Sequence, residues 1–380
     1  MIYLTYNDQP SGVYSSQVSD VCNFLNSELQ AGVKLVAVIS MHSFFDNRRK
    51  IRKEFPNAMV LPAVPKAKYW QFTMLVFTLL CLITGQRKVI ARNVIAAKIA
   101  LFSKKLGLVN KVVLDGRGAI AAEWNEYQVV PDENMKRLIY DQEKTAVINS
   151  DFRIAVSARL INYWQSSYGY NTSNHVVIPC TLNTGFNAFT FSKEELINER
   201  TLMGFKADDV IMVYSGSTAG WQSFNTLGTI LGNVLEKENH FKLLFLSGED
   251  ENIAGMKKRF PGQVASKWVK HHEVQKVLAA CDYGILFREN SVTNQVASPT
   301  KFAEYLSAGL PVIISENLGD YSDFVKIKKC GMVISESDII TLKPITAAEK
   351  QQNIQLALDN FTKQANRKQY EILINFINKE

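Results

Sequence analysis

The sequence predicts an α/β fold made of two doubly wound domains, each with a parallel sheet covered by helices. Its 380 residues exceed what one hydrophobic core usually organises, which indicates two domains. Short apolar runs typical of buried strands alternate with helical stretches in both halves, as in sheets with crossover helices. The composition, 47% hydrophobic and 21% charged, is that of a globular protein rather than a disordered one.

The N-terminal domain, predicted at residues 1–185, contains five apolar runs that read as strands. A helix is expected from about Ser15, because Val18, Cys22 and Leu25 recur at helical spacing and form one buried stripe. The predicted strands are Ile2–Tyr6, Lys34–Ser40, Met59–Pro62, Lys88–Ala91 and Lys111–Asp115.

The C-terminal domain, predicted at residues 186–345, repeats this pattern. The polar segment 183–205 is expected to link the domains, and residues 346–380 are expected to form a helical tail that packs back on the N-terminal domain. The predicted strands are Val210–Tyr214, Lys242–Leu246, Tyr283–Phe287, Leu310–Ile314 and Gly331–Ile334. The predicted helices between them are Trp221–Glu236, His272–Cys281 and Pro299–Ser307.

The cysteines and the start of the chain bear on the compartment. Five cysteines, an odd number without a C-x-x-C pair, indicate reduced thiols and neither a disulfide framework nor a zinc site. No secretory signal precedes the first predicted strand, so a cytoplasmic protein is expected. No D-x-D motif occurs and the histidines are scattered, so we predict no metal site and no cofactor.

The net positive charge comes from the N-terminal half. Residues 1–190 hold 21 Lys or Arg against 13 Asp or Glu, whereas residues 191–380 hold 22 against 23. Such asymmetry favours an anionic partner, either nucleic acid or the lipid headgroups of a cytoplasmic leaflet. No nucleic-acid-binding motif is present, so we expect no nucleic acid and favour an anionic membrane surface, with peripheral association at the inner face of the cytoplasmic membrane.

The most apolar run is Tyr69–Thr84, with Lys66, Lys68, Arg87 and Lys88 around it. Its 16 residues are short for a membrane span of about 20. A buried core helix is the favoured interpretation, and an interfacial helix that dips into lipid is the main alternative.

A phosphate site is predicted where a strand ends at Phe287. Ligands of doubly wound sheets bind beyond the carboxyl ends of the strands, and here Arg288 opens a polar loop. Ser298 is expected to cap a helix that Pro299 starts, so that free amides and Lys301 in the first turn attract phosphate. The alternative is an ordinary cap with a solvated surface lysine.

The helix that follows carries a family resemblance. Its residues fit the motif E-A-x-A-x-G-x-P-V-V, and the chain resembles family 4 of the retaining glycosyltransferases, in a branch similar to bacterial polysaccharide and lipopolysaccharide enzymes. The resemblance extends to the runs VLAACDYGILF, VYSGSTAGWQSF and VVIPCTLNT. The corresponding residues of this chain are Glu304, Tyr305, Ala308, Gly309, Pro311 and Val312.

This resemblance implies a GT-B fold, in which two Rossmann-like domains face a cleft and the C-terminal domain binds a nucleotide-diphosphate sugar. It also implies that Glu304 accepts hydrogen bonds from the ribose hydroxyls of the donor. The first glutamate of the family pattern is replaced by Val296, and the phosphate-binding arginine by Ser217. Lys301 and Arg288 are therefore the expected substitutes that neutralise the leaving diphosphate. The full predicted donor set is Glu304, Ser298, Thr300, Arg288, Gly12 and Ser217, with Lys301 as a catalytic cation.

An acceptor site is predicted after the strand Lys111–Asp115. The run D-G-R-G resembles a motif of polysaccharide-forming members, so Asp115 and Arg117 are predicted to be catalytic and to contact the acceptor or the donor sugar. In the alternative interpretation this is a turn, in which Asp115 caps its own backbone and Arg117 pairs with Glu123. Gly12, in the loop after the first strand, is expected to approach the donor diphosphate.

The predicted function is transfer of a sugar, with retention of configuration, from a nucleotide-diphosphate sugar to a glycan or lipid-linked acceptor. Surface polysaccharide synthesis is the expected setting. The alternatives are a nucleotide-sugar epimerase or hydrolase of the same fold, and a catalytically silent module that binds a nucleotide sugar. An epimerase or hydrolase needs an acid/base pair at the sugar, and no clustered His/Glu pair is evident in the sequence.

Overall fold

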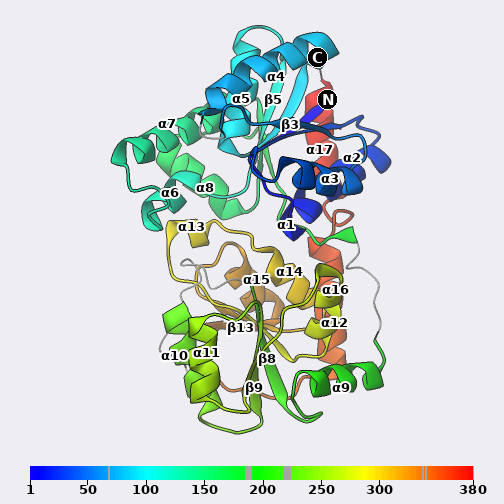
Figure 1. Cartoon of the computed structure of the whole chain (residues 1–380), viewed down its shortest axis with the longest axis vertical. Helices are drawn as coiled ribbons and strands as arrows, with labels where there is room; N and C mark the ends of the chain where they lie inside the picture. Colours follow the sequence, from blue (N-terminus) through cyan, green and yellow to red (C-terminus); the bar gives the residue numbers. More distant parts are fainter. Residues whose placement is uncertain (67–68, 185–190, 217–223, 336–337, 339, 380) are drawn as a thin grey trace. The chain divides into compact units, whose positions relative to one another are not determined.

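A computed structural model describes residues 1–66, 69–184, 191–216, 224–335, 338 and 340–379 (Figure 1). The chain divides into two compact units. Unit 1 comprises Met1–Asn183, Val296–Ser298 and Lys363–Glu380, and unit 2 comprises Thr184–Gln295 and Pro299–Thr362. The two helices of the predicted tail thus fall in different units, because α16 (Ala347–Phe361) belongs to unit 2 and α17 (Arg367–Asn378) to unit 1.

Unit 1 is built on a parallel sheet, which among the described residues has seven strands in the order β3-β2-β1-β4-β5-β6-β7. The order runs outward in both directions from β1 and β4, as in a doubly wound sheet. Its strands are β1 (Ile2–Tyr6), β2 (Lys34–Ile39), β3 (Met59–Pro62), β4 (Lys88–Arg92), β5 (Lys111–Gly116), β6 (Phe152–Ala155) and β7 (His175–Val177).

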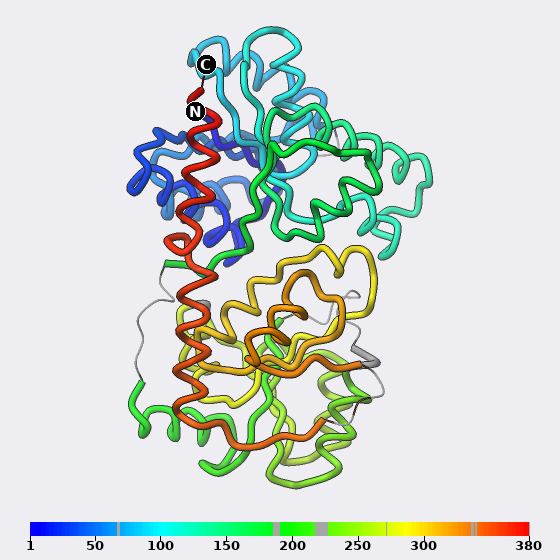
Figure 2. Tube along the Cα trace, turned by 180° about the vertical axis from the view of Figure 1, so that it is seen from behind, coloured from blue at the N-terminus to red at the C-terminus, as the bar shows by residue number. Residues whose placement is uncertain are grey.

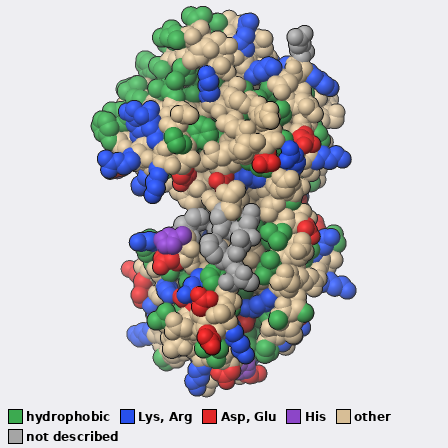
Figure 3. Space-filling view, turned by 90° about the vertical axis from the view of Figure 1, so that its right-hand side faces the viewer, with side chains coloured by type: hydrophobic (Ala, Val, Ile, Leu, Met, Phe, Trp, Pro, Cys, Tyr) green, Lys and Arg blue, Asp and Glu red, His purple; other side chains and the backbone are tan. Residues whose placement is uncertain are grey.

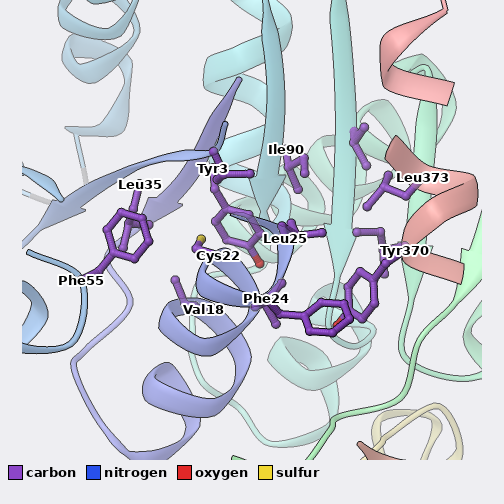
Figure 4. Packing of buried hydrophobic residues seen from close by; sticks show 14 of the residues in the cluster. Tyr3, Val18, Cys22, Phe24, Leu25, Leu35, Phe55, Ile90, Tyr370 and Leu373 are labelled. Atoms are coloured by element: carbon purple, nitrogen blue, oxygen red, sulfur yellow. The ribbon is translucent and has the colours of Figure 1, made fainter. Parts of the chain in front are cut away.

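The helices of unit 1 pack on this sheet. The helix predicted from Ser15 begins as a π-helical turn, η1 (Ser15–Ser19), before α2 (Asp20–Ser27). Figure 4 shows α17 closing the same core, where the Phe24 and Tyr370 ring centroids are 5.3 Å apart. The other helices are α1 (Gly12–Tyr14), α3 (Phe44–Glu54), α4 (Trp70–Thr84), α5 (Asn93–Lys105), α6 (Ile120–Glu126), α7 (Glu133–Asn149) and α8 (Ala158–Tyr168).

Figure 2 shows α17 running past the start of the chain inside unit 1. Tyr370, Leu373 and Tyr3 belong to one buried cluster. The apolar side chains of the C-terminal segment therefore help to complete the core of the N-terminal unit.

Unit 2 repeats the architecture with a parallel sheet of six strands in its described part, ordered β10-β9-β8-β11-β12-β13. Its strands are β8 (Val210–Ser215), β9 (Phe241–Leu246), β10 (Val264–Ser266), β11 (Tyr283–Leu286), β12 (Val312–Ser315) and β13 (Gly331–Ile334). Its helices, besides α16, are α9 (Lys193–Leu202), α10 (Phe224–Leu235), α11 (Glu251–Arg259), η5 (His271–Glu273), α12 (Val274–Ala279), α13 (Val292–Gln295), α14 (Thr300–Ser307) and α15 (Tyr321–Lys328).

Among the differences from the sequence-based expectation, two have local reasons. The predicted linker contains α9, which begins with a capping box between Ser192 and Glu195. The short strand β6 was missed because Arg153 interrupts its apolar run. That arginine is nevertheless buried, since its Nε donates to Val147 O at 2.6 Å and its guanidinium lies over the Tyr170 ring.

Helix α4 corrects a further expectation. It ends at Gly85, whose φ of 63° lies in the left-handed region. Only Thr73, Phe77 and Cys81 are buried on it, so the interpretation as a core helix is wrong. Within the described ranges, no helix is both long enough and apolar enough to cross a bilayer.

Candidate functional site

The sheet of unit 2 places its switch point between β8 and β11. The strand order runs outward in opposite directions from these two neighbouring strands. Ligands of such sheets bind beyond the carboxyl ends of the strands at this point. Tyr214 ends β8 together with Ser215, and Arg288 follows β11 by two residues. Helix α14 is held beside this point.

Tyr305 fixes α14 against both strands. The N–H of Ser215 donates to its hydroxyl at 2.8 Å, and that hydroxyl donates to Ile285 O at 3.2 Å. The buried ring lies against Gly284, where a Cβ atom would come within 2.3 Å of Tyr305 Cγ. Glycine is therefore required at 284, and Tyr305 sets the position of the helix that carries Lys301 and Glu304.

Lys301 and Glu304 lie one turn apart on α14 and are both half-buried. Burial lowers the pKa of Lys301 to about 8, with a further contribution from the charge of Arg288. Burial raises the pKa of Glu304 to about 6, although Lys301 opposes the shift. Neither side chain has an ion pair or hydrogen bond elsewhere in the described residues. The two opposite charges are thus incompletely solvated and available to a ligand.

Arg288 contributes a second cation at the same strand end. Its backbone N–H donates to Ser315 Oγ at 3.1 Å, and its side-chain Nη1 donates to Oδ1 of the buried Asn294 at 3.2 Å. The Lys301 ammonium lies 5.7 Å from the centre of the Tyr214 ring. Arg288 and Lys301 together form a cationic corner with Glu304 beside it.

The remaining predicted donor residues are distributed differently. Ser298 does not cap α14: the N-cap is Pro299, without a side-chain cap, and Ser298 Oγ instead accepts from Cys180 N–H at 2.9 Å within unit 1. Thr300 is the first residue of α14. Gly12 is the exposed first residue of α1 in unit 1, and Ser217 lies outside the described residues.

In unit 1 the predicted acceptor residues form a buried ion network. Arg117 Nε lies 2.8 Å from Asp115 Oδ1, and its Nη2 donates to Oδ2 at 2.9 Å. The hydroxyl of Tyr3 also donates to this carboxylate, whose side chain has no exposed surface. Asp115 therefore does not cap its own turn, and Arg117 pairs with Asp115 rather than with Glu123.

Arg92 links this network to the switch point of the first sheet. It is the last residue of β4, the neighbour of β1, and it lies 3.6 Å from Asp115 Oδ2 and 3.4 Å from Asp8 Oδ2. Burial raises the pKa of Asp8, although the charge of Arg92 opposes the shift. Arg92 was not predicted as a site residue, although it lies at the carboxyl end of a predicted strand, the same signal that singled out Asp115.

A cavity of about 600 Å³ opens beside these groups, wholly within unit 1. Arg117 and Asp8 lie on its wall, and burial raises the pKa of Glu123, which also lines it. Two indole side chains, Trp70 and Trp124, complete its apolar part together with Ile95, Ile120, Met135 and Leu138. A ring that carries hydroxyl groups and also has an apolar face fits such a wall.

Among the residues that the structure describes, no group of three or more His, Cys, Asp or Glu side chains is arranged to hold a metal ion. Acidic groups near the two switch points include Asp8 and Asp115 in unit 1 and Glu304 in unit 2.

Comparisons with known proteins agree with this architecture. Residues 238–370 match the family model "Glucosyltransferase 3-like, C-terminal domain". A search of curated proteins found no matching relative.

Solved structures that resemble the chain over nearly its whole length include sucrose-phosphate synthase from Thermosynechococcus elongatus, with 14% identity and a TM-score of 0.69 over 98% of both chains. HepE from Anabaena, in complex with UDP and glucose, has 13% identity and a TM-score of 0.68 over 98% of this chain and 99% of its own. A glycosyltransferase from Rickettsia africae has 12% identity and a TM-score of 0.72 over 100% of this chain and 99% of its own. The predicted fold class is confirmed: the chain has the α/β GT-B fold of glycosyltransferases, with two Rossmann-like sheets.

Proposed function

We propose that this chain is a retaining glycosyltransferase that moves a hexosyl or related sugar from a nucleotide-diphosphate sugar to a glycan or lipid-linked acceptor. The observation that carries the proposal is the cationic corner of Lys301 and Arg288 with Glu304 at the switch point of unit 2. The resemblance of the α14 motif to the retaining family supports it. So does the match to the glucosyltransferase 3-like domain, which spans α14.

The geometry suits a nucleoside diphosphate. Glu304 as a carboxylate accepts hydrogen bonds from ribose hydroxyls, while the free amides at the start of α14 and the Lys301 ammonium attract phosphate. HepE, a structure of similar fold, was solved with UDP and with UDP-glucose. A nucleotide-sugar donor is therefore the substrate class that these residues fit.

Transfer requires stabilisation of a leaving group. As the bond between sugar C1 and the diphosphate oxygen breaks, negative charge grows on the β-phosphate, and Lys301 and Arg288 stabilise it as it develops. The acceptor oxygen bonds to C1 on the same face, and its proton passes to the departing phosphate oxygen. This route retains the configuration and requires neither a protein nucleophile nor a metal ion.

The cavity of unit 1 is the proposed acceptor site. Its indole walls suit the apolar face of a sugar ring, and Arg117 supplies hydrogen-bond donors at one end. Because the Asp115 carboxylate is fully enclosed, we assign it the role of positioning Arg117. Synthesis of a surface polysaccharide at the inner face of the cytoplasmic membrane is the setting that the family resemblance favours.

Incubation of the purified protein with a panel of nucleotide sugars, with and without glycan acceptors, tests the proposal. A transferase releases nucleoside diphosphate at a rate that depends on the acceptor, and the product keeps the anomeric configuration of the donor. Acceptor-independent conversion of the donor sugar would identify an epimerase or hydrolase instead. Saturable binding without turnover for every pair would identify a silent binding module.

A further inference from the structure

Helix α4 exposes a continuous apolar stripe that the proposed activity does not use. Six large side chains at helical spacing are each between 45% and 74% exposed. The opposite face, with Phe77 and Cys81, packs on the core, so α4 is apolar on both sides. The α4 stripe consists of Phe72, Leu75, Val76, Leu79, Leu82 and Ile83.

Such a surface is unusual for a protein face that meets only water. Isolated exposed apolar residues are common, but a contiguous patch marks a contact with another molecule. Figure 3 shows hydrophobic side chains gathered on one region of unit 1, with lysine and arginine side chains beside them. Contact with another molecule would cover the stripe, and the charge around it indicates which occupant fits.

The sequence around α4 carries charge of one sign only. Residues 55–114 contain no Asp or Glu, although they include all of α4 and α5. They contain nine cationic residues: Lys66, Lys68, Arg87, Lys88, Arg92, Lys98, Lys104, Lys105 and Lys111. An apolar stripe within an exclusively cationic segment complements the boundary of an anionic bilayer, where acyl chains lie under negative headgroups.

A cavity of about 570 Å³ lies between α4, α5 and α7. Lys98, Lys104 and Lys105 line it, together with Met74 of α4. Helices α4 and α5 are tied beside it by a hydrogen bond of 2.8 Å between the hydroxyls of Thr78 and Ser103. One part of the cavity wall therefore belongs to the helix that bears the stripe, and another part carries three lysine side chains.

The three lysines differ in their partners. Lys104 Nζ lies 2.5 Å from Asp151 Oδ1. In the part of the chain that the structure describes, Lys98 and Lys105 have no carboxylate within ion-pair distance. Burial lowers the pKa of Lys98, and within the described residues no carboxylate at ion-pair distance opposes the shift. An anionic group that enters the cavity would supply it.

We propose that the α4 stripe inserts into the acyl boundary of an anionic bilayer and that the Lys98–Lys105 cavity receives the phosphate of a phospholipid headgroup. A second copy of this chain fits less well, because its own α4 would bring a like-charged surface against the first. The proposal concerns unit 1 alone and does not depend on the transferase activity. Vesicle binding and sugar transfer can therefore fail separately.

Co-sedimentation of the full chain with vesicles tests the stripe. Vesicles of phosphatidylcholine with 30% phosphatidylglycerol should carry the protein into the pellet at low salt, and pure phosphatidylcholine vesicles should bind it at least tenfold more weakly. The double variant Leu75→Glu with Leu79→Glu should lower binding at least tenfold without lowering Tm, because both side chains are exposed. Leu202→Glu is the matched control: Leu202, in unit 2, is 67% exposed against 63% for Leu75, and its variant should bind as the wild type does.

The cavity is tested by Lys98→Gln with Lys105→Gln. Loss of two cations near the surface should weaken binding roughly 25-fold at low salt and reduce its salt dependence. Lys328→Gln, an exposed change at the end of α15, should change binding less than twofold. Equal binding of neutral and anionic vesicles, or wild-type binding by either double variant, would overturn the proposal. So would a wild-type dimer that the stripe variant converts to a monomer without any vesicle binding.

Discussion

Arg117 forms a bidentate ion pair with Asp115, with 2.8 Å from Nε to Oδ1 and 2.9 Å from Nη2 to Oδ2. Only the arginine reaches the cavity wall, because the carboxylate is completely enclosed. The two residues therefore have different roles. Asp115 holds the guanidinium plane in place, and Arg117 presents its remaining donors to a ligand.

Removal of each partner should have a different result. Arg117→Ala should lower turnover tenfold or more and leave nucleoside diphosphate affinity nearly unchanged, since the residues proposed to bind the nucleotide belong to unit 2. Asp115→Asn should lower turnover as well, and should also lower the free energy of unfolding by about 3–5 kcal/mol, because it leaves buried cations uncompensated. Nucleotide titration, thermal unfolding and turnover on the same samples check this.

Arg137→Ala, a change at an exposed arginine of the same unit, is the matched control and should leave turnover and stability as in the wild type. A loss of stability in Arg117→Ala with normal turnover per folded molecule would remove the assignment of Arg117 to the acceptor site.

The charges on α14 predict a bell-shaped pH dependence of kcat/KM. As the pH falls below about 6, Glu304 becomes protonated and loses acceptor capacity toward the ribose hydroxyls. As the pH rises above about 8, Lys301 loses its proton and its attraction for the diphosphate. The maximum should therefore lie between these values, and kcat/KM measured from pH 5 to 9 tests it.

Two conservative variants assign the limbs of the profile. Glu304→Gln should remove the acidic limb, because the amide does not titrate. Lys301→Arg should move the basic limb beyond pH 9, because a guanidinium stays charged. Limbs that stay at the same pH in both variants would assign the titrations to other groups.

Gly284 should tolerate no side chain. A methyl group there would lie 2.3 Å from the Tyr305 ring, so Gly284→Ala should displace that ring and weaken its hold on α14. We expect a loss of about 1–3 kcal/mol in the free energy of unfolding, together with weaker nucleotide binding. Gly248→Ala, at an exposed glycine with open space around it, should leave both unchanged. An unaltered Tm in Gly284→Ala would mean that Tyr305 moves freely.

Turnover should not require a divalent metal ion. The proposed chemistry neutralises the diphosphate with Lys301 and Arg288, so activity should survive excess EDTA with at most a small change. Full inactivation by the chelator, reversed by Mg²⁺ or Mn²⁺, would show that another group stabilises the leaving diphosphate.

Much of the fold follows from the sequence because parallel strands are buried on both faces and appear as continuous apolar runs. Strands such as Lys34–Ile39 and Phe241–Leu246 are of this kind. The short strands His175–Val177 and Val264–Ser266 were not predicted, since a run of three residues gives no detectable pattern.

The candidate sites were predictable only in part. Glu304 and Lys301 stand out because a helix start and a motif are local features of the sequence. The ion network of Asp8, Arg92 and Asp115 is not local, because the β1-β4-β5 strand order brings these residues together. Ser298 misled the prediction for a related reason: its hydroxyl bonds the backbone of Cys180, 118 residues away in the sequence.

The central claim is that α14 holds a nucleoside diphosphate, and calorimetric titration with UDP, GDP, ADP, CDP and dTDP tests it most directly. At least one should bind the wild-type protein saturably, and Glu304→Ala should weaken that binding roughly ten- to a hundredfold, the cost of about 1.5–3 kcal/mol for a lost charged hydrogen bond. Glu316→Ala, at an exposed glutamate after β12, should bind as the wild type does. Binding of none of the five, or equal affinity in the wild type and Glu304→Ala, would contradict the account.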